Sequence, residues 1–231
     1  MPSNDTTSLK VNRTAKTLRV LALENLRQAI LSGHFKPGER LIERNLCDQL
    51  DVSRSIVREA LRHLETEGLV ESVAHQGPVV ARLDADQAAQ IYELRGMLES
   101  HAAGLCAEHA SEETIQQLCL LNDRIQQAFK DADHQEVLVR TTAFYEVLFN
   151  GCGQTVAWNM VQTLNARINR LRALTISANG RSREAAKEMK DLVDALRRRD
   201  PQAARAASLA HIQRVAQLAM EALQRLSTSA P

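Results

Sequence analysis

Two arginines and a serine lie close together between residues 54 and 58, and they could read a DNA duplex. Arg54, Ser55 and Arg58 follow Ser53, a favourable N-cap residue, so we expect a helix to begin at Arg54. The first turns of such a helix reach base edges in the major groove. Because an arginine can bind guanine through two hydrogen bonds or hold a phosphate, we predict that these three side chains contact DNA. The alternative is that the arginines are solvated charges on a helical face.

The segments around these residues predict a helix-turn-helix followed by a β-wing. Apolar spacing, capping residues and glycines place helices and strands at 17–32, 43–50, 54–67, 69–73 and 78–82. Arg44 begins the second helix, where it can contact the DNA backbone or a base. His75 and Gly77 lie at the tip of the wing, where a small residue lets the backbone approach the minor groove. We therefore add Arg44, His75 and Gly77 to the candidate DNA contacts.

Beyond residue 84 the strand signals end, and helical spacing continues almost to the C-terminus. Ser111 and Asp200 are expected N-caps, and the helices are expected at 86–109, 112–130, 134–149, 155–178, 182–199 and 201–227. Most of these helices are apolar on one side, so they should pack as a bundle. We expect a mostly α protein, an N-terminal winged helix-turn-helix followed by an all-α bundle of six or seven helices. The expected limits are a disordered arm over 1–15, a DNA-binding domain over 16–83 and a helical effector-binding and dimerisation domain over 84–228.

Composition restricts the classes of function. The 231 residues carry a net charge of only +1, so any nucleic-acid surface must be local. No apolar run approaches the roughly 20 residues that span a bilayer, and the N-terminus lacks an apolar signal core, so we expect a cytoplasmic protein without a membrane segment. The four cysteines form no Cys-x-x-Cys pair and should be reduced thiols. No phosphate loop, nucleophile elbow or zinc-helix motif is present, so we do not expect an enzyme.

The DNA-reading segment resembles a known family. The strings PGERL at 37–41, VSRSIVREAL at 52–61 and LETEGLV at 64–70 resemble the winged-helix domain of GntR-type bacterial transcription regulators. The resemblance covers about residues 17–82, with one departure at Ile56, where the family usually carries proline. It implies operator contacts from six residues, with the last two on the wing: Arg44, Arg54, Ser55, Arg58, His75 and Gly77.

Residues 86–227 resemble the helical effector and dimerisation domain of the FadR branch of that family, the FCD type. The motif YELRGMLE at 92–99 and the alanine-rich last helix with His211 carry this resemblance, and six helices suggest the VanR-like subgroup. The resemblance implies a homodimer and a small-molecule effector, a carboxylate. It also implies that Arg95 helps to anchor that carboxylate. The alternative is that Arg95 forms a solvated ion pair with Glu99, four residues later.

Many members of this branch bind a divalent metal through one aspartate and three histidines. By spacing, those positions fall here on Thr141, Tyr145, Met189 and His211. A single imidazole with a hydroxyl, a phenol and a thioether is a poor metal site, so we predict that the family metal site is lost and that the protein uses no cofactor. We expect the four positions to line an effector cavity instead. The alternative is that Tyr145, Met189 and His211 are packed core residues, with His211 hydrogen-bonded to Tyr145.

These features predict a transcription regulator that binds double-stranded operator DNA as a homodimer, most simply as a repressor. We expect a small organic acid to change its affinity for the operator. The alternative is an effector-free dimeric DNA-binding protein whose helical domain serves only dimerisation. The loss of the metal ligands makes this alternative worth testing.

Overall fold

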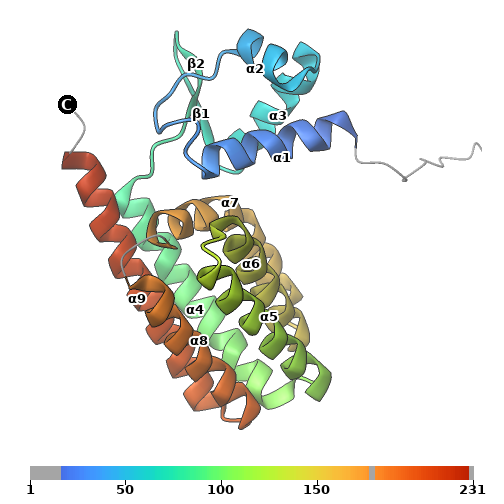
Figure 1. The fold of residues 1–231 in the computed structure, drawn as a ribbon, viewed down its shortest axis with the longest axis vertical. Helices are drawn as coiled ribbons and strands as arrows, with labels where there is room; N and C mark the ends of the chain where they lie inside the picture. Colours follow the sequence, from blue (N-terminus) through green and yellow to red (C-terminus); the bar gives the residue numbers. More distant parts are fainter. Residues whose placement is uncertain (1–16, 177–179, 229–231) are drawn as a thin grey trace, which may run out of the picture.

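The computed structural model describes residues 17–176 and 180–228, and Figure 1 shows a small winged part above a helical bundle. The disordered arm predicted over 1–15 lies outside the described residues. The winged part contains α1 (Leu18–Leu31), α2 (Glu43–Leu50), α3 (Arg54–Thr66), β1 (Val70–Val73) and β2 (Gly77–Val80). The predicted fold class, mostly α with an N-terminal winged helix-turn-helix, is confirmed.

The turn between α2 and α3 sets the start of the reading helix. Asp51 adopts a left-handed conformation with a φ of 51°, which ends α2 and turns the chain. Ser53 is the N-cap residue, as predicted, but its side chain caps no backbone N–H. Its hydroxyl lies 2.9 Å from the hydroxyl of Ser55 instead, so the expected side-chain cap is wrong. A stripe that includes Val57 and Leu64 fixes the buried face of α3, and the opposite face is left to solvent.

The wing is a two-stranded antiparallel sheet in which Val70 pairs with Val80 and Val73 with Gly77. Arg40 joins this sheet through an isolated antiparallel bridge to Val79. β1 begins one residue later than predicted, and β2 begins one residue earlier and ends two residues earlier. The N–H of Ala81 still donates to the Leu69 carbonyl at 3.0 Å, just beyond the two strands. The wing thus stays anchored to the core that α1, α2 and α3 share.

The helical bundle contains α4 (Ala85–His109), α5 (Glu112–Lys130), α6 (His134–Gly151), α7 (Thr155–Ile176), α8 (Arg181–Arg197) and α9 (Pro201–Thr228). Figure 1 shows α4 and α9 side by side along their length. Two predicted caps are confirmed: the Ser111 hydroxyl accepts the N–H of Thr114 at 3.2 Å, and the Asp200 carboxylate accepts the N–H of Ala203 at 2.9 Å. These caps explain why α5 and α9 begin where the sequence predicts.

Helix α7 belongs to the bundle but also touches the winged part. Ala166 is buried in the apolar cluster of the winged part, and the guanidinium of Arg167 covers Gly68 at the end of α3. Gly68 has a φ of 70°, and a Cβ there would lie 2.0 Å from the Nε of Arg167. Arg170 is also buried, and its Nη1 has no hydrogen-bond partner among the described residues. One helix therefore connects the bundle to the DNA-reading part.

Candidate functional sites

The predicted DNA-reading side chains lie on the solvent face of α3. Arg54 and Ser55 occupy its first turn and are exposed, and Arg58 follows one turn later with 61 % of its side chain exposed. Val57, between them, is fully buried, so the helix cannot rotate to hide the arginines without exposing its core face. This arrangement presents two guanidinium groups near a helix N-terminus, which also favours phosphate.

Arg58 is held by a residue that the sequence reasoning missed. Its Nε donates to both carboxylate oxygens of Glu43, at 2.9 and 3.0 Å, and Glu43 begins α2. Hydrogen bonding and charge from Glu43 raise the pKa of Arg58. Arg44 is exposed immediately beside this pair. The fifteen-residue separation of Glu43 and Arg58 crosses the turn, so no helical spacing rule could have found the contact.

The two wing residues occupy the tip of the hairpin. His75 is exposed with a φ of 64°, and Gly77 has a φ of 80° with open space where a side chain would begin. A groove of about 260 Å³ lies between α3 and the wing, with Arg58 on one wall and Ser72 and Pro78 on the other. The structure thus places Arg58 beside the strands that carry the tip. The DNA-binding roles of these residues stay predictions.

A second candidate site is a small cavity of about 50 Å³ inside the helical bundle. Four of the five residues predicted for the effector site line it together: Arg95, Thr141, Met189 and His211. The fifth, Tyr145, is buried next to it, with its ring 5.3 Å beneath the guanidinium carbon of Arg172. The positions that the family resemblance indicated thus lie together although they come from four different helices, and their role in binding stays a prediction.

Arg95 forms the ion pair with Glu99, but not in solvent. Its Nε donates to Glu99 at 2.8 Å, and the two side chains are only 2 % and 0 % exposed. The alternative of a solvated pair is thus wrong, because α4 turns this face toward the cavity. Burial opposes the charge of Arg95, but Glu99 outweighs it and the pKa of Arg95 is raised. The Nη1 of Arg95 has no hydrogen-bond partner within the described residues.

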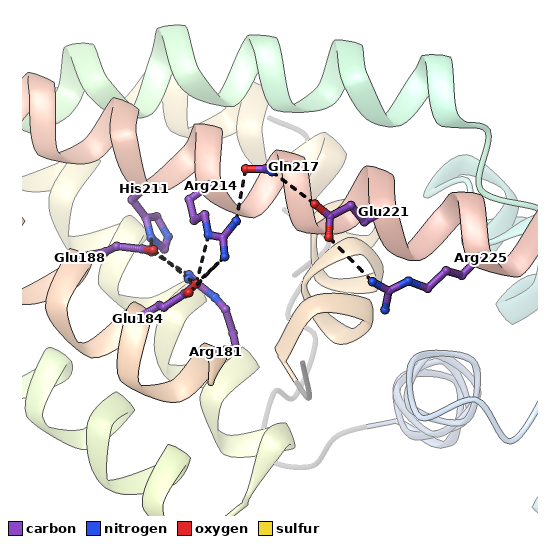
Figure 2. Close-up of polar contacts among 8 residues, drawn as sticks. All are labelled: Arg181, Glu184, Glu188, His211, Arg214, Gln217, Glu221 and Arg225. Atoms are coloured by element: carbon purple, nitrogen blue, oxygen red, sulfur yellow. Dashed lines mark hydrogen bonds and ion pairs between the residues drawn. The ribbon is translucent and has the colours of Figure 1, made fainter. Parts of the chain in front are cut away.

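His211 pairs with a residue other than the one considered from the sequence. Its Nδ1 lies 2.6 Å from a carboxylate oxygen of Glu188, and that carboxylate also accepts two hydrogen bonds from Arg181 at 2.9 and 2.8 Å (Figure 2). The alternative of a hydrogen bond between His211 and Tyr145 is wrong, because the Tyr145 hydroxyl has no hydrogen-bond partner among the described residues. Burial opposes ionisation of Glu188, but hydrogen bonds from His211 and Arg181 lower its pKa to about 2. Burial lowers the pKa of His211 despite that carboxylate.

The same figure shows that the polar contacts continue along α9 at the surface. Glu184 on α8 accepts hydrogen bonds from Arg214 on α9, and Arg214 in turn donates to Gln217. These outer residues do not line the cavity. They attach α8 to α9 and so support the helices that carry Glu188 and His211.

Arg172 is the third guanidinium of the cavity wall. The sequence left open which arginine of α7 would face the site, and Arg167 and Arg170 turn to the winged part instead. The Nη1 of Arg172 donates to the side-chain oxygens of Asn169 at 2.9 Å and Thr142 at 3.4 Å. No carboxylate of the described chain lies within ion-pair distance of it. Burial, together with the positive charge of Arg95, lowers its pKa to about 10.

The residues of this cavity do not fit a divalent metal. Thr141 donates its hydroxyl hydrogen to the Val137 carbonyl at 2.7 Å, and His211 is held by Glu188. Burial raises the pKa of Tyr145, so its phenol stays neutral. Within the described ranges no group of three His, Cys, Asp or Glu side chains is placed to hold a metal ion. The positive charge of Arg172, which no carboxylate of the described residues pairs with, would also repel a cation.

Comparison with known families places these sites in context. The sequence model described as "Bacterial regulatory proteins, gntR family" matches residues 20–80, and the one described as "FCD domain" matches residues 90–214. The chain belongs to the GntR family and carries an FCD domain. The exposed arginines of α3 are thus on the winged helix of a GntR regulator, and the cavity lies within its FCD domain.

Individual relatives agree with this assignment. The chain is 29 % identical to the uncharacterized HTH-type transcriptional regulator YdhC of Bacillus subtilis, over 80 % of this chain and 84 % of that protein. It is 28 % identical to the gluconate operon transcriptional repressor of the same species, over 58 % of this chain and 56 % of that one. The Escherichia coli McbR/YncC structure superimposes with a TM-score of 0.71 at 25 % identity, covering 88 % of this chain and 98 % of that one. No described helix of the GntR regulator is both long enough and apolar enough to cross a membrane.

Proposed function

We propose that this GntR regulator represses transcription by binding operator DNA as a homodimer, and that a small organic acid in the helical-domain cavity changes its affinity for the operator. One observation carries the proposal furthest. Arg172, a partly buried arginine of the cavity wall without a carboxylate partner among the described residues, lies on α7, the helix that also packs against the DNA-reading part. A bound anion would therefore act on a helix that both parts share.

The DNA-binding half of the proposal rests on α3. Its exposed first turns carry Arg54, Ser55 and Arg58, whose donors suit guanine edges and phosphates. A dimer follows from the geometry of DNA, since two half-sites in adjacent major grooves are read by a two-fold pair of reading helices. Operator binding takes place on the bacterial chromosome, so we place the protein in the cytoplasm. The domain limits of 16–83 and 84–228 are part of the same proposal.

The direction of the effect is supported by analogy. A relative is named as the repressor of a gluconate operon, which associates a related chain with repression and with a sugar acid. We carry over repression and the carboxylate class only, because that relative shares 28 % identity. We also propose that the site works without a metal, since its one imidazole already has a carboxylate partner.

Two measurements on the full-length protein test this function. Fluorescence anisotropy with duplexes from the DNA flanking its own gene should show tight binding to one fragment and weaker binding to a scrambled one. Arg54→Ala with Arg58→Ala should abolish that preference, whereas Arg62→Ala, one turn further along α3, should reduce binding without removing the preference. Equal binding to all duplexes by the wild type would overturn an operator-reading role.

A second function, DNA binding without an effector, is favoured by one observation. The cavity is small, and Arg95 and Arg181 already have carboxylate partners inside the protein. A thermal-shift screen with organic acids separates the two functions, since a ligand that binds only the folded state raises the melting temperature. An acid that raises the melting temperature and also changes the affinity for operator DNA supports the effector function. No response to any acid supports a domain that serves only dimerisation.

A further inference from the structure

We propose that the cavity selects a monoanion of two or three carbons, a short monocarboxylate, and that Arg172 is the residue that distinguishes one carboxylate from two. This inference rests on the proposed effector function and narrows it to one charge class. It follows from the charges of the wall, its free hydrogen-bond donors and its size.

The charges of the wall leave one positive charge without compensation. Arg95 is neutralised by Glu99, and Arg181 by Glu188, each through hydrogen bonds of less than 3 Å. Arg172 makes its polar contacts with neutral oxygens only, within the part of the chain that the structure describes. Arg172 is partly buried, and a charge held partly out of water without a partner is unfavourable, so a bound anion that carries a single charge would complete the wall. A dianion would leave a buried negative charge instead.

The free donors of the wall also suit one carboxylate. The hydroxyls of Thr141 and Thr175 donate within their own helices, to the carbonyls of Val137 and Arg172. Among the described residues that line the cavity, the Nη1 of Arg95 is a buried donor without a hydrogen-bond partner. Arg172 donates side-chain hydrogen bonds from its Nη1, to Thr142 and Asn169. Arg95 and Arg172 line the same cavity and lie close enough for each charge to affect the other. Together they offer one cationic end to the ligand.

The rest of the cavity is apolar and small. Its remaining wall includes side chains that offer no hydrogen bond to a second carboxylate: Ile125, Phe129, Val137, Leu138, Ile176 and Val215. About 50 Å³ is room for roughly three to five water-sized groups, at about 10–15 Å³ for each. Propionate has a comparable number of non-hydrogen atoms. A ligand with one carboxylate and a short alkyl chain matches both ends of this cavity.

The test compares three probes of equal length on the full-length dimer: propionate, malonate and propionamide. Isothermal titration and thermal shift should show propionate binding at least tenfold more tightly than the dianion malonate or the neutral amide. Tighter binding of malonate, or equal binding of propionamide, would overturn the charge argument while leaving the effector function intact. A longer acid that binds while propionate does not would overturn the size argument. A failure of every organic acid in the wider screen would instead overturn the proposed function itself.

Variants of α7 test the role of Arg172. Arg172→Gln should weaken propionate binding at least tenfold and remove the preference over propionamide, and Arg172→Lys should keep the charge preference with weaker binding. Arg170→Gln is the matched control, since this buried arginine of the same helix faces the winged part, and propionate binding should be unchanged. Without ligand, Arg172→Gln should melt no lower than the wild type, because it removes an uncompensated charge. A large loss of stability with unchanged propionate affinity would make Arg172 a structural residue and overturn its assignment.

Discussion

The replacement Glu188→Gln tests whether the Arg181–Glu188–His211 cluster stabilises the helical domain through charge. Glutamine keeps the shape and one hydrogen-bond acceptor, but it removes the carboxylate from a guanidinium that is only 3 % exposed. The nearest remaining carboxylate is that of Glu184, 3.9 Å from Arg181 and close to the surface. The variant therefore leaves a buried cation with a distant and partly solvated partner.

The size of the loss can be worked out from the exposure of the cluster. Removing one member of a buried ion pair costs about 3–5 kcal/mol. The lowered pKa of Glu188, about 2 against an ordinary 4.5, sets a similar upper value of about 3 kcal/mol. Glu188 is 19 % exposed, so solvent screening reduces both figures, and we expect a loss of about 2 kcal/mol. For a chain of this size that corresponds to a fall in melting temperature of roughly 4–8 °C.

The stability difference between wild type and Glu188→Gln should depend on pH in one direction. A carboxyl group whose pKa is lowered by folding stabilises the protein above its unfolded pKa, and that stabilisation disappears as the pH falls. The difference between wild type and Glu188→Gln should thus be full at pH 7 and shrink between about 4.5 and 2. His211, whose pKa is lowered by burial, adds a separate loss of wild-type stability as the pH falls below its ordinary value of 6.5.

Circular dichroism melts at pH 7, 5 and 3.5 would measure these effects. Glu184→Gln is the matched control, because this glutamate lies one turn earlier on α8 and pairs with Arg214 near the surface. It should lower the melting temperature much less. A Glu188→Gln protein that melts within 1 °C of the wild type at pH 7, on the scale expected above, would refute the charge argument. A deficit that does not change with pH would show that the loss comes from packing.

Four further outcomes can be measured directly. Arg58→Ala should weaken operator binding roughly 5- to 100-fold and relax base preference, and an unchanged footprint would remove Arg58 from the contacts. Glu43→Gln should tighten DNA binding about two- to fivefold in anisotropy titrations, because Arg58 must leave this carboxylate to reach DNA; weaker binding would mean that Glu43 orients Arg58 productively. Gly68→Ala should lower the free energy of unfolding by about 1–2 kcal/mol in urea, since its φ is 70° and the new Cβ meets Arg167; wild-type stability would contradict the left-handed turn. Elemental analysis should find well under one equivalent of zinc, nickel or manganese per chain, and a stoichiometric metal would show that the ligand assignment is wrong.

Local chemistry explains which parts of this structure could be predicted from sequence. Asp200 and Pro201 determine the start of α9 through a cap that needs no knowledge of the fold. Helical spacing also predicted the pairing of Arg95 with Glu99, because four residues bring both onto one face. Whether that face met solvent or the cavity depended on the packing of other helices, and for this reason the alternative of a solvated pair is wrong.

Contacts between side chains on different helices could not be predicted from the spacing of residues within one helix. Glu188 and His211 meet because of the register of α8 against α9, which no repeat in either segment records. The sequence also could not decide which of Arg167, Arg170 and Arg172 faces the cavity, for a related reason. Helix α7 is covered by the bundle on one side and by the winged part on another, so several of its faces are buried and its apolar pattern does not single out one direction.

The position of α7 shortens the distance over which a signal must travel. Ala166 lies in the hydrophobic core of the winged part, and Arg172 lines the cavity of the helical bundle, six positions further on. At 1.5 Å per residue they are about 9 Å apart on one unbroken rod. Any pull on Arg172 that tilts or slides this rod displaces Ala166 in the same movement. Coupling between the winged part and the cavity thus requires no series of contacts through other residues, because one rigid helix has residues in both.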